Sequence, residues 1–317
     1  MLIYIKPLSV FPEIHSDRLF GAIFSAIVEL YPEKIEDIIN DFRNNNPPFI
    51  ISSTFPSINV DDEKIRFFPK IIVNNSFNNS FELNDLKDFK KVEFYEEKIF
   101  FDIINGNLSE NDILSNYNEY HRINNLLMVK DRHVNIKVKN TILPNNMVNR
   151  LSNETKIFYS EGLRYSEDIE MFCFIEIYNQ EYESIIKSAF KFLKDRGFGR
   201  DISIGKGQFD YTIEDIDIND IFENSEVHDE DRFITLSRFI PSESDLKFIK
   251  DYSDYEILSK RSKDKSGEIR KQVRFFKEGS TFKNYSKHYG CIVESGGIKP
   301  AIEYGFAFPL NYTLKGD

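Results

Sequence analysis

The chain has 317 residues, of which 41% are hydrophobic and 15% aromatic, and its formal net charge is −11 at pH 7. This composition excludes a disordered chain and indicates a folded protein with room for two domains, or for one domain with large insertions. The acidic balance argues against a protein that coats nucleic acid non-specifically, because Lys and Arg supply that affinity, but it allows a local basic site.

No stretch approaches the roughly 18 uninterrupted apolar residues of a membrane span, and Met1 to Pro7 has the pattern of a first strand, not of a signal peptide. We therefore expect a cytoplasmic protein. The two cysteines, Cys173 and Cys291, form no Cys-x-x-Cys metal or redox motif and are expected to be buried thiols.

The chain opens with a strand and a helix. Leu2 to Leu8 has the pattern of a strand, and Ser16 is then expected to cap a helix. The apolar positions of that helix recur at helical spacing: Leu19, Ile23, Ala26, Ile27 and Leu30. After a break at 44–48, strands are predicted at Phe49 to Phe55 and at Ile65 to Val73.

A region of mixed signals follows, from about residue 85 to residue 161. It contains a possible short helix near Asn111 to Met128 and a poorly periodic, Asn- and Lys-rich segment from Lys130 to Arg150. A long stretch without clear elements inside a compact domain is unusual. We interpret this region as an insertion.

The clearest β-α-β signal comes next. Met171 to Tyr178 is almost continuously apolar, as expected for a central strand covered on both faces. Glu181 to Arg196 is an amphipathic helix, and a strand is predicted at Gln208 to Ile213. With the opening strand and helix, this gives the β-α-β-β-α-β order of a ferredoxin-like domain, a common RNA-binding platform.

A second, smaller α+β unit is predicted after an acidic linker. Arg232 to Ser237 is expected to be a strand, and Pro241 and Ser242 to begin a helix. Three further strands are expected near Gln272 to Phe276, Gly290 to Glu294 and Tyr304 to Phe308. The predicted fold class is α+β, with two tandem ferredoxin-like (RRM-like) domains: residues 1–215, carrying the insertion at about 85–161, and residues 216–317.

The glycine-rich loop from Gly197 to Gly207 is the most distinctive motif. Glycines let the backbone approach a ligand closely, so successive N–H groups can converge on a phosphate while Arg200 and Lys206 supply charge. A Walker A loop is excluded because Gly207 stands where Ser or Thr is needed, and a dinucleotide motif because Ile202 replaces its third glycine. The alternative is a helix cap at Gly197 followed by a tight hairpin.

Charge is segregated along the chain. An acidic stretch runs from Glu214 to Asp231. A basic island follows it, made of Lys260, Arg261, Lys263, Lys265, Arg270, Lys271 and Arg274. The island could face RNA while other faces meet proteins, or both runs could be solvated loops.

Several motifs together resemble the RAMP superfamily, and within it the fourth-subunit family of type III-A CRISPR (Csm) effector complexes. Ser16 to Ile23 is similar to the first-helix signature of that family, and Gly197 to Phe209 to its glycine-rich loop. Gly279 to Phe282 and Tyr304 to Pro309 resemble its C-terminal domain, and Asn149 to Ser152, less exactly, its thumb. The resemblance spans nearly the whole chain.

The resemblance implies a non-catalytic scaffold that holds the 5′ repeat-derived handle of the guide RNA (crRNA) in antiviral defence. It implies two protein partners, the large polymerase-like Cas-ten-type subunit and the first backbone RAMP subunit of the Csm complex. A β-hairpin thumb would help to displace a base of the guide–target duplex. No cofactor or metal is implied.

The candidate RNA-binding residues lie in the loop, the thumb and the first helix. In the loop they are Gly197, Gly199, Arg200, Ser203, Gly205, Lys206 and Gly207. In the thumb they are His133, Arg150 and Tyr159, of which Tyr159 could stack on a base. Taken singly, each of these is more often an ordinary surface or core residue. Ser16 is added to the set, although a helix cap is the favoured role for it.

No sequence motif indicates catalysis. The five histidines form no His-Glu-x-x-His pair, there is no Gly-x-Ser-x-Gly motif, and His228-Asp229 lies in the acidic linker without partner ligands nearby in sequence. The main rival is an endoribonuclease of the same superfamily that processes guide precursors, with His15 as general base on a ribose 2′-OH. A second rival is a structural adaptor whose glycine loop only caps a helix.

Overall fold

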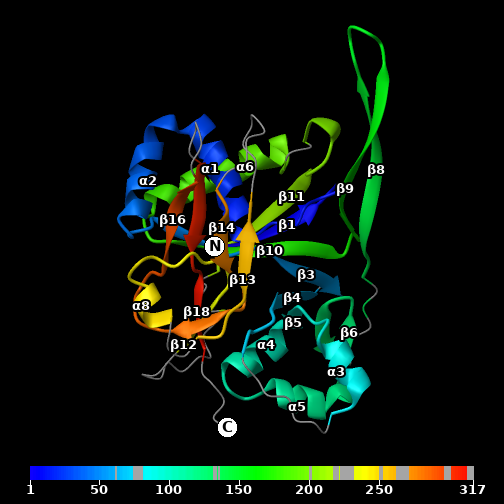
Figure 1. Cartoon of the computed structure of the whole chain (residues 1–317), viewed down its shortest axis with the longest axis vertical. Helices are drawn as coiled ribbons and strands as arrows, with labels where there is room; N and C mark the ends of the chain where they lie inside the picture. The colour runs from blue at the N-terminus through cyan, green and yellow to red at the C-terminus, as the bar shows by residue number, and fades with distance from the viewer. Residues whose placement is uncertain are drawn as a thin grey trace.

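The structure is a computed structural model of the chain. It describes all residues except 61–62, 74–80, 131–133, 135, 200–201, 217–220, 222–231, 250–252, 262–270, 296–300 and 313–317. The predicted α+β class is confirmed, because helices and several β-sheets are mixed along the chain (Figure 1). Among the described residues, no helix combines the length and apolar character needed to cross a membrane.

The centre of the molecule is a nine-stranded sheet with strand order β11-β1-β10-β3-β4-β5-β7-β6, and β2 also pairs with β10. Its first four strands have the 4-1-3-2 order of a ferredoxin-like sheet, with every neighbouring pair antiparallel. The bounds of β1, β2, β3, β10 and β11 are Leu2–Pro7, Phe49–Ile51, Phe55–Val60, Ile169–Ile177 and Phe209–Glu214. As predicted, the strand through Cys173 is central and its thiol is fully buried.

Both faces of this sheet are covered. Two helices, α1 (Ser16–Leu30) and α6 (Glu181–Arg196), pack side by side on one face, with α2 (Ile35–Arg43) beside them (Figure 1). On the other face Phe174 stacks on Phe308 of the C-terminal part, with 5.9 Å between ring centroids. Burial on both faces explains why Met171 to Ile175, in the middle of this strand, carry only apolar side chains.

The sheet continues into the inserted region. Strands β4, β5, β6 and β7 span Glu63–Pro69, Phe94–Glu96, Tyr120–Ile123 and Leu126–Val129. Helices α3 (Leu83–Phe89), α4 (Glu97–Ile104) and α5 (Glu110–Ser115) pack around them (Figure 1). The helix expected near Asn111 to Met128 ends at Ser115, and the rest of that segment is a 3₁₀ turn (Tyr117–Glu119) and the β6–β7 hairpin.

A long two-stranded ribbon, β8 (Val138–Val148) and β9 (Thr155–Tyr165), projects away from the body (Figure 1). We call this ribbon the thumb. Its two strands pair over eleven residues each, although the sequence of β8 has little periodicity. Because the ribbon is solvated on both faces, neither face needs to be apolar, and the period-2 signal of a half-buried strand is absent.

The C-terminal part is built from small antiparallel sheets. Its strands β12 to β18 span Arg232–Thr235, Ile257–Lys260, Val273–Phe276, Thr281–Lys283, Gly290–Ser295, Ala301–Phe306 and Pro309–Tyr312, and α8 is Leu246–Ile249. They form a three-stranded sheet of order β15-β12-β18 and two hairpins, β13–β14 and β16–β17. The division at residue 215 and a second ferredoxin-like unit stay predictions. Cys291, expected to be buried, is half-buried.

Candidate nucleic-acid interface

A groove of about 780 Å³ lies where α1, α6, the glycine loop, the base of the thumb and the β13–β14 hairpin meet. The glycine loop connects α6 to β11 and includes the 3₁₀ turn Ile202–Ile204. The helical wall of the groove is lined by small residues of α1, namely Ala22, Ser25 and Ala26. These short side chains leave space between α1 and the end of α6, where larger ones would fill it.

The groove is locally basic in an acidic protein. Its cations are Arg18, Arg196, Lys206, Lys260 and Arg261, and its carboxylates are Glu29, Glu161 and Glu303. The five cations outnumber the three carboxylates, whereas the whole chain carries a net charge of −11. A concave surface with excess positive charge attracts polyanions.

Arg18 and Arg261 have no carboxylate partner among the described residues. Arg18 is exposed, and its guanidinium donates to the backbone carbonyl of Glu13 at 3.2 Å. Within the part of the chain that the structure describes, neither Arg18 nor Arg261 forms an ion pair. By contrast, Arg196 is paired with Glu29 at the rim of the groove. The two unpaired arginines face the groove from opposite parts of the chain.

The glycine loop closes on itself more tightly than the sequence suggested. The N–H groups of Gly197, Gly205 and Gly207 donate to Leu193, Ile202 and Val10 carbonyls at 2.7, 3.1 and 2.9 Å. A Cβ atom at Gly207 would lie 1.8 Å from the carbonyl oxygen of Phe198. These three N–H groups serve the fold, and Gly197 caps α6 as the alternative interpretation expected. Gly199, at φ +106°, is exposed and lines the groove.

Lys206 links the loop to the thumb. Lys206 is only 7% exposed, and its Nζ donates to the backbone carbonyl of Glu161 in β9 at 3.2 Å. Leu163, two residues after Glu161 in β9, forms a backbone bridge with Phe11, with N···O distances of 2.9 and 3.3 Å. Lys206 therefore fixes the thumb base and contributes its charge to the groove wall.

The thumb brings one predicted RNA contact near the groove and leaves another far from it. Tyr159 is 69% exposed and lies on the same face of β9 as Glu161, two residues further out. Arg150 is exposed in the tip, beyond Thr155, which is itself roughly 20 Å along the strand from Glu161 at about 3.3 Å per residue. The groove and the thumb tip are separate surfaces.

Ser16 contributes to an interface within the protein. The helix cap expected for it is wrong, because His15 is the N-cap residue and no side chain caps α1. The Ser16 residue is fully buried, its N–H donates to Ser53 Oγ, and its own Oγ accepts from the backbone N–H of Arg238, both at 2.9 Å. We therefore leave Ser16 out of the RNA surface proposed below.

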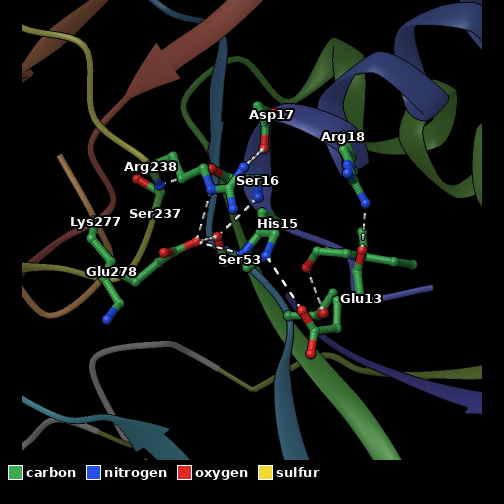
Figure 2. Close-up of polar contacts among 12 residues, drawn as sticks. Glu13, His15, Ser16, Asp17, Arg18, Ser53, Ser237, Arg238, Lys277 and Glu278 are labelled. Carbon is green, nitrogen blue, oxygen red and sulfur yellow. Dashed lines mark hydrogen bonds and ion pairs between the residues drawn. The ribbon is translucent and has the colours of Figure 1, made fainter. Parts of the chain in front are cut away.

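His15 belongs to the same polar cluster (Figure 2). Its Nδ1 lies 2.9 Å from Glu278 Oε1, which also accepts a 2.5 Å hydrogen bond from Ser53 Oγ. Burial would raise the pKa of Glu278, but His15, Arg238 and Ser53 together lower it to about 2. His15 is held against the buried carboxylate of Glu278, which links the N-terminal and C-terminal parts of the chain. This position indicates a structural role for His15.

Some predicted site residues lie outside the described part of the chain. Arg200 and His133 are among them, as are much of the acidic stretch, with His228, and three residues of the basic island, Lys263, Lys265 and Arg270. The side chain of Ser203 is not described either. The sequence prediction missed Arg18 and Arg196 as groove cations and did not single out Lys260 or Arg261 within the basic island. A signal was present only for the last two, as members of a cationic run.

No protein-family model matches the chain. The Csm4 protein of the CRISPR system of Methanocaldococcus jannaschii is 22% identical over 276 residues, which cover 77% of this chain and 71% of that protein. A chain in the crystal structure of a Csm3–Csm4 subcomplex of the type III-A CRISPR-Cas interference complex has a TM-score of 0.68 at 18% identity, with 98% of this chain and 99% of that one covered. A chain of a Csm1–Csm4 cassette in complex with one ATP has a TM-score of 0.56 at 17% identity, covering 100% and 99%.

The chain thus has an α+β fold that is shared by chains in a Csm3–Csm4 subcomplex of the type III-A CRISPR-Cas interference complex and in a Csm1–Csm4 cassette. Within that class the chain resembles the Csm4 subunit in sequence. The resemblance to the fourth Csm subunit, expected from the motifs, is confirmed.

Proposed function

We propose that this chain is a non-catalytic RNA-binding scaffold of a type III-A CRISPR interference complex, acting inside the cell in antiviral defence. It would hold the 5′ handle of the guide RNA in the groove between α1, α6, the glycine loop and the β13–β14 hairpin. It would dock the large polymerase-like subunit and the first backbone RAMP subunit.

The groove carries this proposal. Arg18 and Arg261 offer guanidinium groups without carboxylate partners among the described residues, which suits phosphate oxygens. Gly199 allows a close approach of the backbone, because a side chain there would narrow the entrance. These contacts position an RNA backbone and do not read bases.

The side chains of the thumb favour binding of single-stranded RNA over duplex RNA. Tyr159 is exposed next to the groove, and Ile142 and Ile157 are 61% and 64% exposed on the same face of the ribbon. Exposed aromatic and apolar side chains beside a basic groove are the usual platform for unpaired bases. The partners are proposed because similar chains occur in Csm3–Csm4 and Csm1–Csm4 complexes.

The test is a gel assay of the full chain with labelled repeat-derived RNA, followed by a denaturing gel. If about three phosphates are neutralised, raising the salt from 0.05 to 0.2 M should weaken binding about 20-fold while the RNA stays intact. Failure to bind RNA both alone and with its large and backbone partner subunits would overturn the proposal. Specific cleavage that is lost in His15→Ala would reassign the chain to the endoribonucleases.

Replacement of Tyr159 tests the thumb separately. We expect Tyr159→Ala to bind single-stranded RNA about 10-fold more weakly, because one base–aromatic stack contributes about 1–3 kcal/mol. Tyr159→Phe keeps the ring and should bind within about twofold of the native chain. Equal affinities for the Ala and Phe variants in a fluorescence titration would show that no base stacks there.

A further inference from the structure

Asp17 is a buried carboxylate in the first turn of α1 that holds two cations from the C-terminal part. Its side chain is completely shielded from solvent, its Oδ2 lies 2.6 Å from Lys260 Nζ, and its Oδ1 lies 3.4 Å from Arg238 Nη1. Lys260 is held on its other side by Glu303 of β17, also at 2.6 Å. One ammonium group therefore ties together α1, β13 and β17.

The next residues along the chain after this ion pair are two groove arginines that have no carboxylate partner among the described residues. Arg18 follows Asp17 on α1, and Arg261 follows Lys260 at the end of β13. Figure 2 shows Asp17 directed toward Arg238 and Arg18 directed away from it, toward Glu13. The contact between Asp17 and Lys260 thereby sets where the chain places one arginine relative to the other.

We propose that Asp17 is a positioning residue for the RNA groove, which fixes the β13–β14 hairpin against α1 so that Arg18 and Arg261 contact the same RNA backbone. This inference rests on the proposed function. The side chain of Asp17 is fully buried, so it would act without contacting RNA. Its action passes through Lys260, because that side chain is the direct link between the two segments that carry the arginines.

The direction of the change in RNA affinity distinguishes a positioning role of Asp17 from a direct electrostatic effect of its charge. A carboxylate close to a polyanion site repels the ligand, so removal of its charge alone strengthens binding. Loss of a positioning contact does the opposite, because the two arginines are then no longer held in one arrangement. Asp17→Asn is nearly isosteric, removes the charge and leaves Glu303 as the one carboxylate that pairs with Lys260 among the described residues.

The experiment compares Asp17→Asn with Glu29→Gln in the full chain, using labelled repeat-derived single-stranded RNA. Glu29 lines the same groove and neutralises Arg196, but it touches neither Lys260 nor Arg238. We expect Asp17→Asn to bind about 10-fold more weakly. Glu29→Gln removes a groove carboxylate and releases Arg196, so it should bind RNA more tightly than the native chain. In an Arg261→Ala background, Asp17→Asn should weaken RNA binding by less than a further factor of about two, because both changes act on the same contact.

Each outcome has one meaning. RNA binding by Asp17→Asn that equals or exceeds that of the native chain would overturn this inference and leave the proposed function intact. Absence of binding by the native chain would instead reject the proposed function. Circular dichroism and urea unfolding establish whether Asp17→Asn is folded. If it is not, Glu303→Gln is tested instead, because it removes the other carboxylate from Lys260. It must also weaken RNA binding.

Discussion

A double variant, Arg18→Ala with Arg261→Ala, is expected to bind repeat-derived RNA about 100-fold more weakly than the native chain. Each guanidinium that contacts phosphate contributes a charge-assisted hydrogen bond, and the loss of about 1.4 kcal/mol from each is tenfold in affinity. Arg18 comes from the first turn of α1 and Arg261 from the end of β13, so each single variant should lose about half of the free energy.

The salt dependence of the same variant gives a second measurement. Two phosphate contacts fewer should reduce the slope of log affinity against log salt by about 1.4, because each contact to a single strand contributes about 0.7. The matched control is Lys87→Ala with Lys98→Ala, which removes two exposed positive charges on α3 and α4. An equal loss of affinity in both double variants would show that net charge matters and the groove does not.

The second large effect concerns stability. Glu278→Gln is expected to lower the free energy of unfolding by about 3 kcal/mol at pH 7. The pKa of the Glu278 carboxyl is lowered to about 2 from its ordinary value of 4.5, so its charged form stabilises the folded state. The contacts that stabilise it reach from His15 and Ser53 of the N-terminal part to Arg238 of the C-terminal part (Figure 2).

The pH dependence follows from the direction of this shift. The contribution of Glu278 is fully present above pH 4.5 and is lost as the pH falls toward 2, since protonation then removes the charge. Urea unfolding at pH 7 and pH 3.5 should therefore show the gap between the native chain and Glu278→Gln narrowing by about 1.4 kcal/mol. The exposed Glu33→Gln serves as control. A gap that stays constant with pH would contradict the role assigned to this carboxylate.

The sequence predicted the central fold because its elements are buried. The helix at Glu181–Arg196 and the strand at Ile169–Ile177 carry clear periodic or continuous apolar patterns, and both were found within two residues of the expected bounds. No residue pattern indicated the thumb strand Val138–Val148, since its side chains face solvent, and only the family resemblance implied a β-hairpin thumb. A buried helix or strand has a periodic or continuous apolar pattern in its sequence, whereas a solvated ribbon has no such pattern.

The candidate site was only partly predictable for a related reason. The glycine loop was located correctly, but its sequence could not show that Gly207 donates to Val10 or that Lys206 reaches the thumb. The groove joins segments that are up to about 290 residues apart, from Val10 to Glu303. A single arginine such as Arg18 is recognisable as a groove residue only when those segments are placed together.

The thumb also bears on how the protein can be handled. Beyond the bridge at Leu163, its two strands pair only with each other in the described part of the chain, so both long edges offer free backbone groups. Exposed apolar side chains, among them Leu151 at 99%, lie along the same ribbon. Unprotected edges with apolar side chains favour strand-to-strand association. Under the proposed function, production together with the partner subunits should therefore give more soluble protein than expression of the chain by itself.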